Sequence, residues 1–320
     1  MGKCDRFGFK FKSYQYPFPK PLHTHYGVWK VREGVIITLE DGMGKISQGE
    51  IAPIPWFGSE TVAQALQFCQ QLGDTVTIED ITSISDRLPA CQFAFESAWE
   101  GLLESDRDND YSALSYCSLL PAGEAALTAL RNLDIFNTDK DLTFKWKIGV
   151  KTLAKEIDIL QQLVEVLPPQ AKLRLDANGG LNTSQARKLL AVTENIPAIE
   201  FIEQPLSPKH FTEMLALERE YATTIAIDES VASLDRLQNC FEGGWRGVFV
   251  IKAAIMGYPS RLRQFCGDNS IDAVFSSVFE TEIGRQAVLN LAVELNNRDR
   301  LCRFRERNRA VGFNNKHIEH

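Results

Sequence analysis

The sequence predicts an α/β protein in which a barrel of alternating strands and helices follows a smaller N-terminal α+β unit. From about Ser115 onward, short apolar or β-branched runs alternate with amphipathic helical stretches, which is typical of parallel βαβ units. Polar residues also recur at the ends of these runs at similar intervals. The chain has 320 residues, which is long enough for one large domain or two ordinary ones.

The N-terminal unit begins with strand signals. Residues 1–18 alternate polar and aromatic side chains and lack the apolar region of a secretory signal, so this segment is predicted to be a strand. The run Val35–Leu39 is followed by the turn-rich residues 40–44 and by Lys45–Ile51. This succession predicts a β-hairpin.

A loop and two helices complete this unit. Pro53–Gly58 is predicted to be a loop because its prolines interrupt regular pairing. Ser59 is predicted to cap a following helix that ends at Gly73. The apolar face of that helix consists of Val62, Leu66, Cys69 and Leu72. Ala94–Leu103 is predicted to be a second helix.

The rest of the chain contains six predicted strands separated by helical stretches such as Leu153–Leu167. The strands are Phe144–Ile148, Lys172–Leu175, Ala198–Ile202, Thr224–Ile227, Gly247–Ile251 and Ala273–Ser276. A series of this length favours a closed barrel, and an open doubly wound sheet is the alternative.

A polar residue lies at or next to the C-terminal end of each predicted strand. These residues are Lys147, Asp176, Glu203, Asp228, Lys252 and Ser276, at intervals of 29, 27, 25, 24 and 24 residues. Each interval accommodates one strand, one helix and two loops. A barrel would therefore bring all of them to one rim, where the catalytic groups of barrel enzymes gather.

The chemistry of this set indicates a metal site. Asp176, Glu203 and Asp228 would repel one another in a dry cleft unless a cation lay among them, and hard oxygen ligands suit Mg²⁺. Lys147 and Lys252 come from strands on either side and could approach a bound substrate from opposite faces. Taken singly, each residue has an ordinary alternative as a surface charge, a turn residue or a helix cap.

Bulk composition narrows the classes of partner. The net charge of −7 argues against nucleic acid or an anionic membrane, and no apolar run approaches the roughly 20 residues of a membrane span. The seven cysteines are scattered without a CxxC pair, which favours reduced thiols in the cytoplasm. A small-molecule carboxylate is the predicted partner, and no oligomeric state is predicted.

Five segments of the barrel resemble the enolase superfamily. They are Lys145-Trp146-Lys147, Asp176-Ala177-Asn178, Glu203-Gln204-Pro205, Asp228-Glu229-Ser230 and Ile251-Lys252. The lysine-x-lysine pair is similar to that of the muconate-lactonizing subgroup. Within this subgroup, residues 49–55 and 251–257 together with Ser276-Ser277 most resemble the o-succinylbenzoate synthase family.

This resemblance implies a (β/α)₇β modified TIM barrel beneath an N-terminal α+β capping domain. The expected division is a capping domain over residues 1–110, which also takes part of the C-terminal tail, a barrel over 111–313 and a tail over 314–320. The implied reaction is the Mg²⁺-dependent syn-dehydration of 2-succinyl-6-hydroxy-2,4-cyclohexadiene-1-carboxylate to 2-succinylbenzoate. In that family the reaction serves menaquinone or phylloquinone biosynthesis.

A mechanism can be stated as a hypothesis. Lys147 would remove the proton next to a metal-bound carboxylate and form an enediolate, and the nearby cations of Lys145 and Mg²⁺ would favour its neutral amine. Lys252 would stay cationic on the other face. Asn178 and Glu229 are predicted to orient the metal ligands or the lysines. Ser276 and Ser277 are predicted to bind the succinyl end of the substrate.

Three alternatives remain open at this point. N-succinylamino acid racemases and dipeptide epimerases use the same lysine pair, although no Asp-x-Asp motif typical of the epimerases follows Ser277. A catalytically inactive ligand-binding barrel belongs to a different class.

The arginine-rich segment 298–309 stands where the eighth strand is expected, and only residues 310–313 resemble that strand. Residues 53–59 and 23–30 are predicted to cover the pocket.

Overall fold

The computed structural model describes residues 6–24, 27–103, 111, 114–132, 142–296 and 310–311. In this part of the chain, one four-stranded sheet precedes one eight-stranded sheet. The arginine-rich segment 298–309 and the tail 314–320, for which predictions were made, lie outside the described residues.

The N-terminal sheet is antiparallel. Its strands are β1 (Arg6–Thr24), β2 (Gly27–Glu40), β3 (Ile46–Ile51) and β4 (Thr75–Thr77), in the order β3-β2-β1-β4. The predicted first strand and hairpin are confirmed. Phe7 and Phe9 are buried on one face of β1, and Val35, Ile37 and Leu39 are buried on β2, because alternate residues of a strand point to one face.

Three α-helices and a short 3₁₀ helix, Pro55–Phe57, accompany this sheet. The helices are α1 (Val62–Gln71), α2 (Ile78–Thr82) and α3 (Pro89–Leu103). α3 packs on β3, where a Cβ atom on Gly49 would lie 2.0 Å from the carbonyl oxygen of Ala94. Only glycine permits this close approach between helix and strand.

The predicted helix cap at Ser59 was wrong. The N-cap of α1 is Thr61, whose side chain accepts a hydrogen bond from the N–H of Gln64. The Ser59 hydroxyl instead accepts a hydrogen bond from the backbone N–H of Ile54 at 2.7 Å, so it orders the preceding loop. Both residue types favour caps, and tertiary packing decided which one begins the helix.

The second sheet alternates strand and helix through seven units and ends with one more strand. The elements are β5 (Ser115–Leu120), α4 (Ala125–Arg131), β6 (Thr143–Lys147), α5 (Leu153–Val166), β7 (Lys172–Asp176), α6 (Thr183–Thr193), β8 (Ile199–Glu203), α7 (Phe211–Glu220), β9 (Ile225–Ile227), α8 (Leu234–Glu242), β10 (Val248–Ile251), α9 (Pro259–Asp268), β11 (Asp272–Phe275), α10 (Glu282–Asn296) and β12 (Ala310–Val311). Each of the six predicted strands is confirmed to within one residue at either end.

The sheet curls into a (β/α)₇β barrel. Its parallel strands follow the order β11-β10-β9-β8-β7-β6-β5-β12, and β12 contacts β11 at the other edge. The fold class is as the sequence predicted. The domain boundaries stay a prediction.

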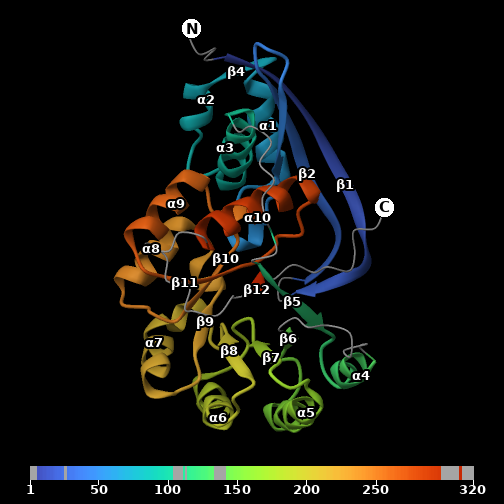
Figure 1. The fold of residues 1–320 in the computed structure, drawn as a ribbon, viewed down its shortest axis with the longest axis vertical. Helices are drawn as coiled ribbons and strands as arrows, with labels where there is room; N and C mark the ends of the chain where they lie inside the picture. Colours follow the sequence, from blue (N-terminus) through green and yellow to red (C-terminus); the bar gives the residue numbers. More distant parts are fainter. Residues whose placement is uncertain are drawn as a thin grey trace.

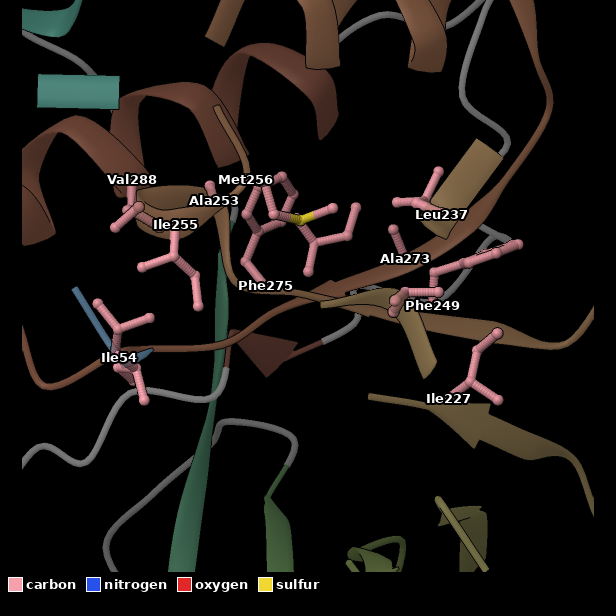
Figure 2. Close-up of a cluster of buried hydrophobic side chains, with 14 of the residues drawn as sticks. Ile54, Ile227, Leu237, Phe249, Ala253, Ile255, Met256, Ala273, Phe275 and Val288 are labelled. Atoms are coloured by element: carbon pink, nitrogen blue, oxygen red, sulfur yellow. The ribbon is translucent and has the colours of Figure 1, made fainter. Parts of the chain in front are cut away.

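The cap and the barrel share one hydrophobic core. In Figure 1 the N-terminal sheet with α1, α2 and α3 lies at one end of the barrel, next to α9 and α10. Figure 2 shows Ile54 of the cap near Ile255 and Val288 of the barrel, and all three belong to the same buried cluster. This shared packing places the cap over the barrel end that carries the polar residues. Among the described helices, none is long and apolar enough to cross a bilayer.

Candidate active site

The polar residues predicted to share one rim do share it. Lys147, Asp176 and Glu203 are the last residues of β6, β7 and β8, and they pair in register across the sheet. Asp228, Lys252 and Ser276 directly follow β9, β10 and β11. The strand-and-helix repeat therefore does bring groups far apart in the sequence to one end of the barrel, as the spacing predicted.

Lys145 links two of the carboxylates. Its Nζ lies 2.8 Å from Oδ2 of Asp176 and 2.8 Å from Oε1 of Glu203. Burial by itself would lower the pKa of Lys145, but the negative charges of Asp176, Glu203 and Asp228 outweigh burial and hold its pKa well above the ordinary value. These carboxylates therefore favour the charged form of Lys145.

Lys252 forms a second ion pair on the other side of the rim. Its ammonium contacts Oδ1 of Asp228, and its Nζ lies 4.2 Å from the centroid of the Phe57 ring. Phe57 belongs to the capping domain, in the loop segment predicted to cover the pocket. Another ring of that segment, Trp56, contacts Trp29 at 4.8 Å between centroids. The cap thus supplies aromatic surface directly above a barrel lysine.

Lys147 differs from its two neighbours in its contacts. Its side chain is half-buried at the end of β6. No hydrogen bond or ion pair joins its amine to another described residue, whereas Lys145 and Lys252 are both held by carboxylates. Within the described part of the chain, Lys147 is therefore the one lysine of these three that no carboxylate holds in place.

The buried carboxylates carry more negative charge than the protein compensates. Burial, assisted by the nearby charge of Asp176, raises the pKa of Glu203 to about 7. Burial also raises the pKa of Asp228 to about 6, although Lys252 acts in the opposite direction. The pKa of Glu229 is raised too, first by burial and then by Asp176. This corner of the protein therefore favours additional positive charge.

Asn178 connects two of these acidic groups. Its backbone N–H donates to Oδ1 of Asp176 at 3.0 Å, and its Nδ2 donates to Oε1 of Glu229 at 3.2 Å. The backbone of Asn178 has a φ of 43°, which asparagine tolerates better than most residues. Asn178 thus contacts both carboxylates, and its role in orienting them stays a prediction.

The donor set fits a magnesium ion. Asp176, Glu203 and Asp228 offer only carboxylate oxygens, which are the ligands Mg²⁺ prefers. With Glu229 they make two more carboxylates than the ammonium groups of Lys145 and Lys252 neutralise. The buried Oε2 of Glu229 has no hydrogen-bond partner among the described residues. A divalent cation would match the uncompensated charge.

The side chains do not enclose a metal in the arrangement described. Within the described ranges, no group of three or more His, Cys, Asp or Glu residues has metal-binding geometry. The ammonium groups of Lys145 and Lys252 lie against the carboxylates instead.

Gln204 is a site residue whose role the sequence did not reveal. It is fully buried and its backbone has a φ of 39°. Its Oε1 accepts the backbone N–H of Asp228 at 2.9 Å, and its Nε2 donates to the Ser230 hydroxyl at 2.8 Å. Gln204 therefore ties the end of β8 to the segment that carries Asp228. Its position directly after Glu203 was the available signal.

The two predicted substrate-binding serines differ in their contacts. Ser276 follows β11, and its backbone N–H donates to the carbonyl of Ile251 at 2.8 Å. The Ser277 hydroxyl donates to Oε2 of Glu280 and accepts from the N–H of Phe279, both at 2.8 Å. The Ser277 hydroxyl is therefore engaged in hydrogen bonds within its own loop. Substrate binding by both serines stays a prediction.

Residues of the cap hold this loop in place. The sequence reasoning did not identify these residues either. Arg32 is 1% exposed, and its Nε donates to the carbonyl of Phe279 at 3.1 Å. Its Nη1 donates to the carbonyl of Pro53 at 2.9 Å. Glu50, likewise 1% exposed, accepts the backbone N–H of Thr281 at 2.8 Å. These contacts join cap and barrel beside the rim.

Comparisons with known proteins agree with this geometry. Residues 142–319 match the family model described as Enolase C-terminal domain-like, and residues 9–102 match the one described as MenC, N-terminal domain. The chain is 38% identical over 293 residues to an o-succinylbenzoate synthase of Thermosynechococcus vestitus, an alignment covering 88% of this chain and 87% of that protein. It is 25% identical to an o-succinylbenzoate synthase of Aliivibrio fischeri, over 89% of this chain and 82% of that protein.

Solved structures give the same result. The o-succinylbenzoate synthase of Thermosynechococcus elongatus BP-1, complexed with Mg in its active site, superposes with a TM-score of 0.84 at 37% identity and covers 92% of each chain. A dipeptide epimerase of Enterococcus faecalis, at 20% identity and a TM-score of 0.76 over 90% of this chain and 87% of that one, shares the fold. Sequence, domain pairing and structure agree that this chain belongs to the o-succinylbenzoate synthase family of the enolase superfamily.

Proposed function

We propose that the protein catalyses the o-succinylbenzoate synthase reaction, the syn-dehydration of 2-succinyl-6-hydroxy-2,4-cyclohexadiene-1-carboxylate to 2-succinylbenzoate in menaquinone or phylloquinone biosynthesis. The observation that carries this proposal is the meeting of three buried carboxylates, two lysines that pair with them, and one lysine without a carboxylate partner among the described residues, all at a single barrel rim. The 38% identity to a synthase over nearly the whole chain supports the choice of substrate.

Lys147 is the proposed base and acid. Its amine removes the proton from the ring carbon that bears the carboxylate, and the electrons of the broken C–H bond pass into that carboxylate. The protonated Lys147 then donates its proton to the hydroxyl that leaves the adjacent carbon on the same face. Water departs and the ring becomes aromatic. The lack of an ion pair between Lys147 and the other described residues supports this role.

Lys252 is proposed to stay cationic and to face the negative charge that develops on the substrate. Its ammonium is held beside the carboxylate of Asp228. β10, which precedes Lys252, is separated from β6, which carries Lys147, by β7, β8 and β9. The two lysines therefore approach the barrel mouth from well-separated strands, as a reaction with one base and one opposing cation requires.

Asp176, Glu203 and Asp228 are the proposed ligands of Mg²⁺. When bound, Mg²⁺ would stabilise the charge that develops on the substrate carboxylate. Asn178 and Glu229 are proposed to keep these ligands oriented, and Lys145 to compensate their charge. Ser276 is proposed to contact the succinyl end of the substrate, with Ser277 shaping the same loop.

The test is direct turnover. Purified protein with Mg²⁺ and the cyclohexadiene substrate is expected to form an aromatic product, followed by ultraviolet absorbance. Absence of turnover, with no effect of EDTA, would refute the proposal. Exchange of the α-hydrogen of N-succinyl amino acids in deuterated water is the assay for a racemase, the closest alternative chemistry.

We also propose a reducing, cytoplasmic location. Cys69, Cys91, Cys117, Cys240 and Cys266 are free thiols. Such thiols persist where glutathione and thioredoxin keep proteins reduced.

A further inference from the structure

One buried carboxylate organises the loop that follows Lys147. Glu156 lies in the first turns of α5 and is 2% exposed. Its Oε2 accepts the N–H of Gly149 at 2.9 Å, and its Oε1 accepts the N–H groups of Val150 at 2.8 Å and Lys151 at 2.9 Å. Three successive backbone donors therefore converge on one side chain.

Ordinary helix capping does not account for this arrangement. The N-cap residue of α5, Thr152, makes no side-chain capping bond. Gly149, Val150 and Lys151 are exposed, so water could satisfy their N–H groups without any protein partner. Burying a charged carboxylate instead costs desolvation free energy, which its hydrogen bonds must offset. What the Glu156 contacts add is a fixed shape for an otherwise exposed loop.

The same loop packs against the turn that carries Asp176. The N–H of Ile148 donates to the carbonyl of Asp176 at 2.8 Å. Gly149 has a φ of 78°, and a Cβ atom there would lie 3.4 Å from the carbonyl oxygen of Ala177. Lys147 itself pairs with Asp176 in the sheet register. The loop therefore joins the end of β6, with its lysine, to the end of β7, with its carboxylate.

We propose that Glu156 is a positioning residue for Lys147. By holding the N–H groups of residues 149–151, it fixes the C-terminal end of β6 and with it the approach of the Lys147 amine to the substrate. The inference rests on the proposed function, because that function gives Lys147 a proton to remove from the substrate. Glu156 acts through the loop backbone and touches no reacting atom.

The expected effect follows from the sensitivity of proton transfer to geometry. A displacement of about 1 Å in a reacting group can reduce a rate by about 100-fold. Substrate binding depends on other groups of the rim and on the cap. Loosening the loop should therefore lower kcat by about 10- to 100-fold while KM changes by less than about threefold.

Glu156→Gln is the matched variant, because it keeps the shape and one acceptor oxygen but replaces the other oxygen with an NH₂ group. Kinetics on the cyclohexadiene substrate are combined with amide hydrogen exchange of residues 149–151. We expect the kcat loss together with exchange at least about 10-fold faster among these amides, since one of their two acceptor oxygens is replaced by a donor. Asp158→Asn, an exposed position on the same helix, is the control and should match the wild type in both measurements.

Two results would overturn the inference. One is faster amide exchange with an unchanged kcat, and the other is a rise in KM alone. Failure of the wild type to turn over the substrate would instead refute the proposed function, and the exchange data would still report on the loop. If Glu156→Gln does not fold, Glu156→Asp is measured in the same way, since it keeps the charge but shortens the reach to the loop.

Discussion

The Nζ atom of Lys145 lies 2.8 Å from Oε1 of Glu203, although their strands, β6 and β8, are separated by β7. The lysine side chain thus reaches past Asp176 on the intervening strand, which it also contacts. Lys147, two residues further along β6, has no such partner among the described residues. Two lysines of one short motif therefore differ in their contacts: Lys145 pairs with carboxylates, and Lys147 is left for the role of base that we propose.

Replacing Lys147 with alanine should lower kcat by at least about 100-fold, because general acid–base catalysis typically contributes a factor of about 10² to 10⁴. The product is followed by ultraviolet absorbance. The stabilisation of the protein by Mg²⁺ should persist, since the amine is not a proposed ligand. Lys188→Ala, at an exposed position on α6, is the control. Retained turnover would remove Lys147 from its proposed role.

Removing the metal should abolish activity, and adding Mg²⁺ back should restore it. Mg²⁺ should also raise the melting temperature, because a ligand at about 100 times its Kd stabilises the folded state by about 2.7 kcal/mol. Asp176→Asn should weaken this stabilisation, since the amide does not compensate the charge of the ion. Equal thermal shifts for the variant and the wild type would argue against Asp176 as a ligand.

Phe57→Leu should reduce kcat/KM by about two- to fivefold. Leucine keeps an apolar side chain but lacks the aromatic face that lies 4.2 Å from the Lys252 ammonium, a contact worth about 0.5–1 kcal/mol. Phe57→Tyr keeps the ring and should behave like the wild type. Steady-state kinetics of the pair isolate the ring contact, and identical values for leucine and tyrosine would show that it has no role.

Glu50→Ala should destabilise the protein by about 3 kcal/mol, because buried donors of Thr281 and Gly284 lose their acceptor. The free energy of unfolding is measured with urea. Glu40→Ala, at an exposed position on β2, should change it by less than about 0.5 kcal/mol. Equal stabilities for the two variants would mean that Glu50 does not clamp the cap to the barrel.

The thiols of Cys69 and Cys240 should resist alkylation in the folded protein. Burial raises the pKa of Cys69 to about 12 and that of Cys240 to about 11. Because the thiolate is the reactive form and accumulates only near or above the pKa, both stay neutral at pH 8. Mass spectrometry after iodoacetamide treatment should find them unmodified until denaturant is added. Rapid native labelling of Cys69 would contradict its burial.

The barrel and its rim could be predicted because both depend on local patterns. Each strand is a short apolar run, and the residue type at its end is visible directly, as for Asp176 and Glu203. Parallel strands bring their C-terminal ends to the same edge, so a regular repeat in the sequence becomes proximity in space. The rim positions of the proposed metal ligands and of both lysines followed from this without knowledge of any contact.

Other features depended on which of two similar side chains forms a given hydrogen bond, and local sequence patterns do not decide this. Ser59 and Thr61 are both good capping residues, and the contact of Ser59 with Ile54 left Thr61 to begin α1. Ser277 has the same hydroxyl as Ser276, yet the buried Glu280 engages only Ser277. In each case two similar hydroxyls were available for one role, and packing selected between them.

By itself, the sequence determined the order of strands and helices and the chemical groups at the strand ends, because hydrophobic periodicity and residue type act over a few residues. Only the tertiary structure decided which charges pair, as when Lys145 contacts Glu203 and Lys252 contacts Asp228 beneath Phe57. It also decided that Glu156 holds the loop after Lys147. Electrostatic and hydrogen-bond energies depend on separation and burial, and both are set only when the barrel closes beneath its cap.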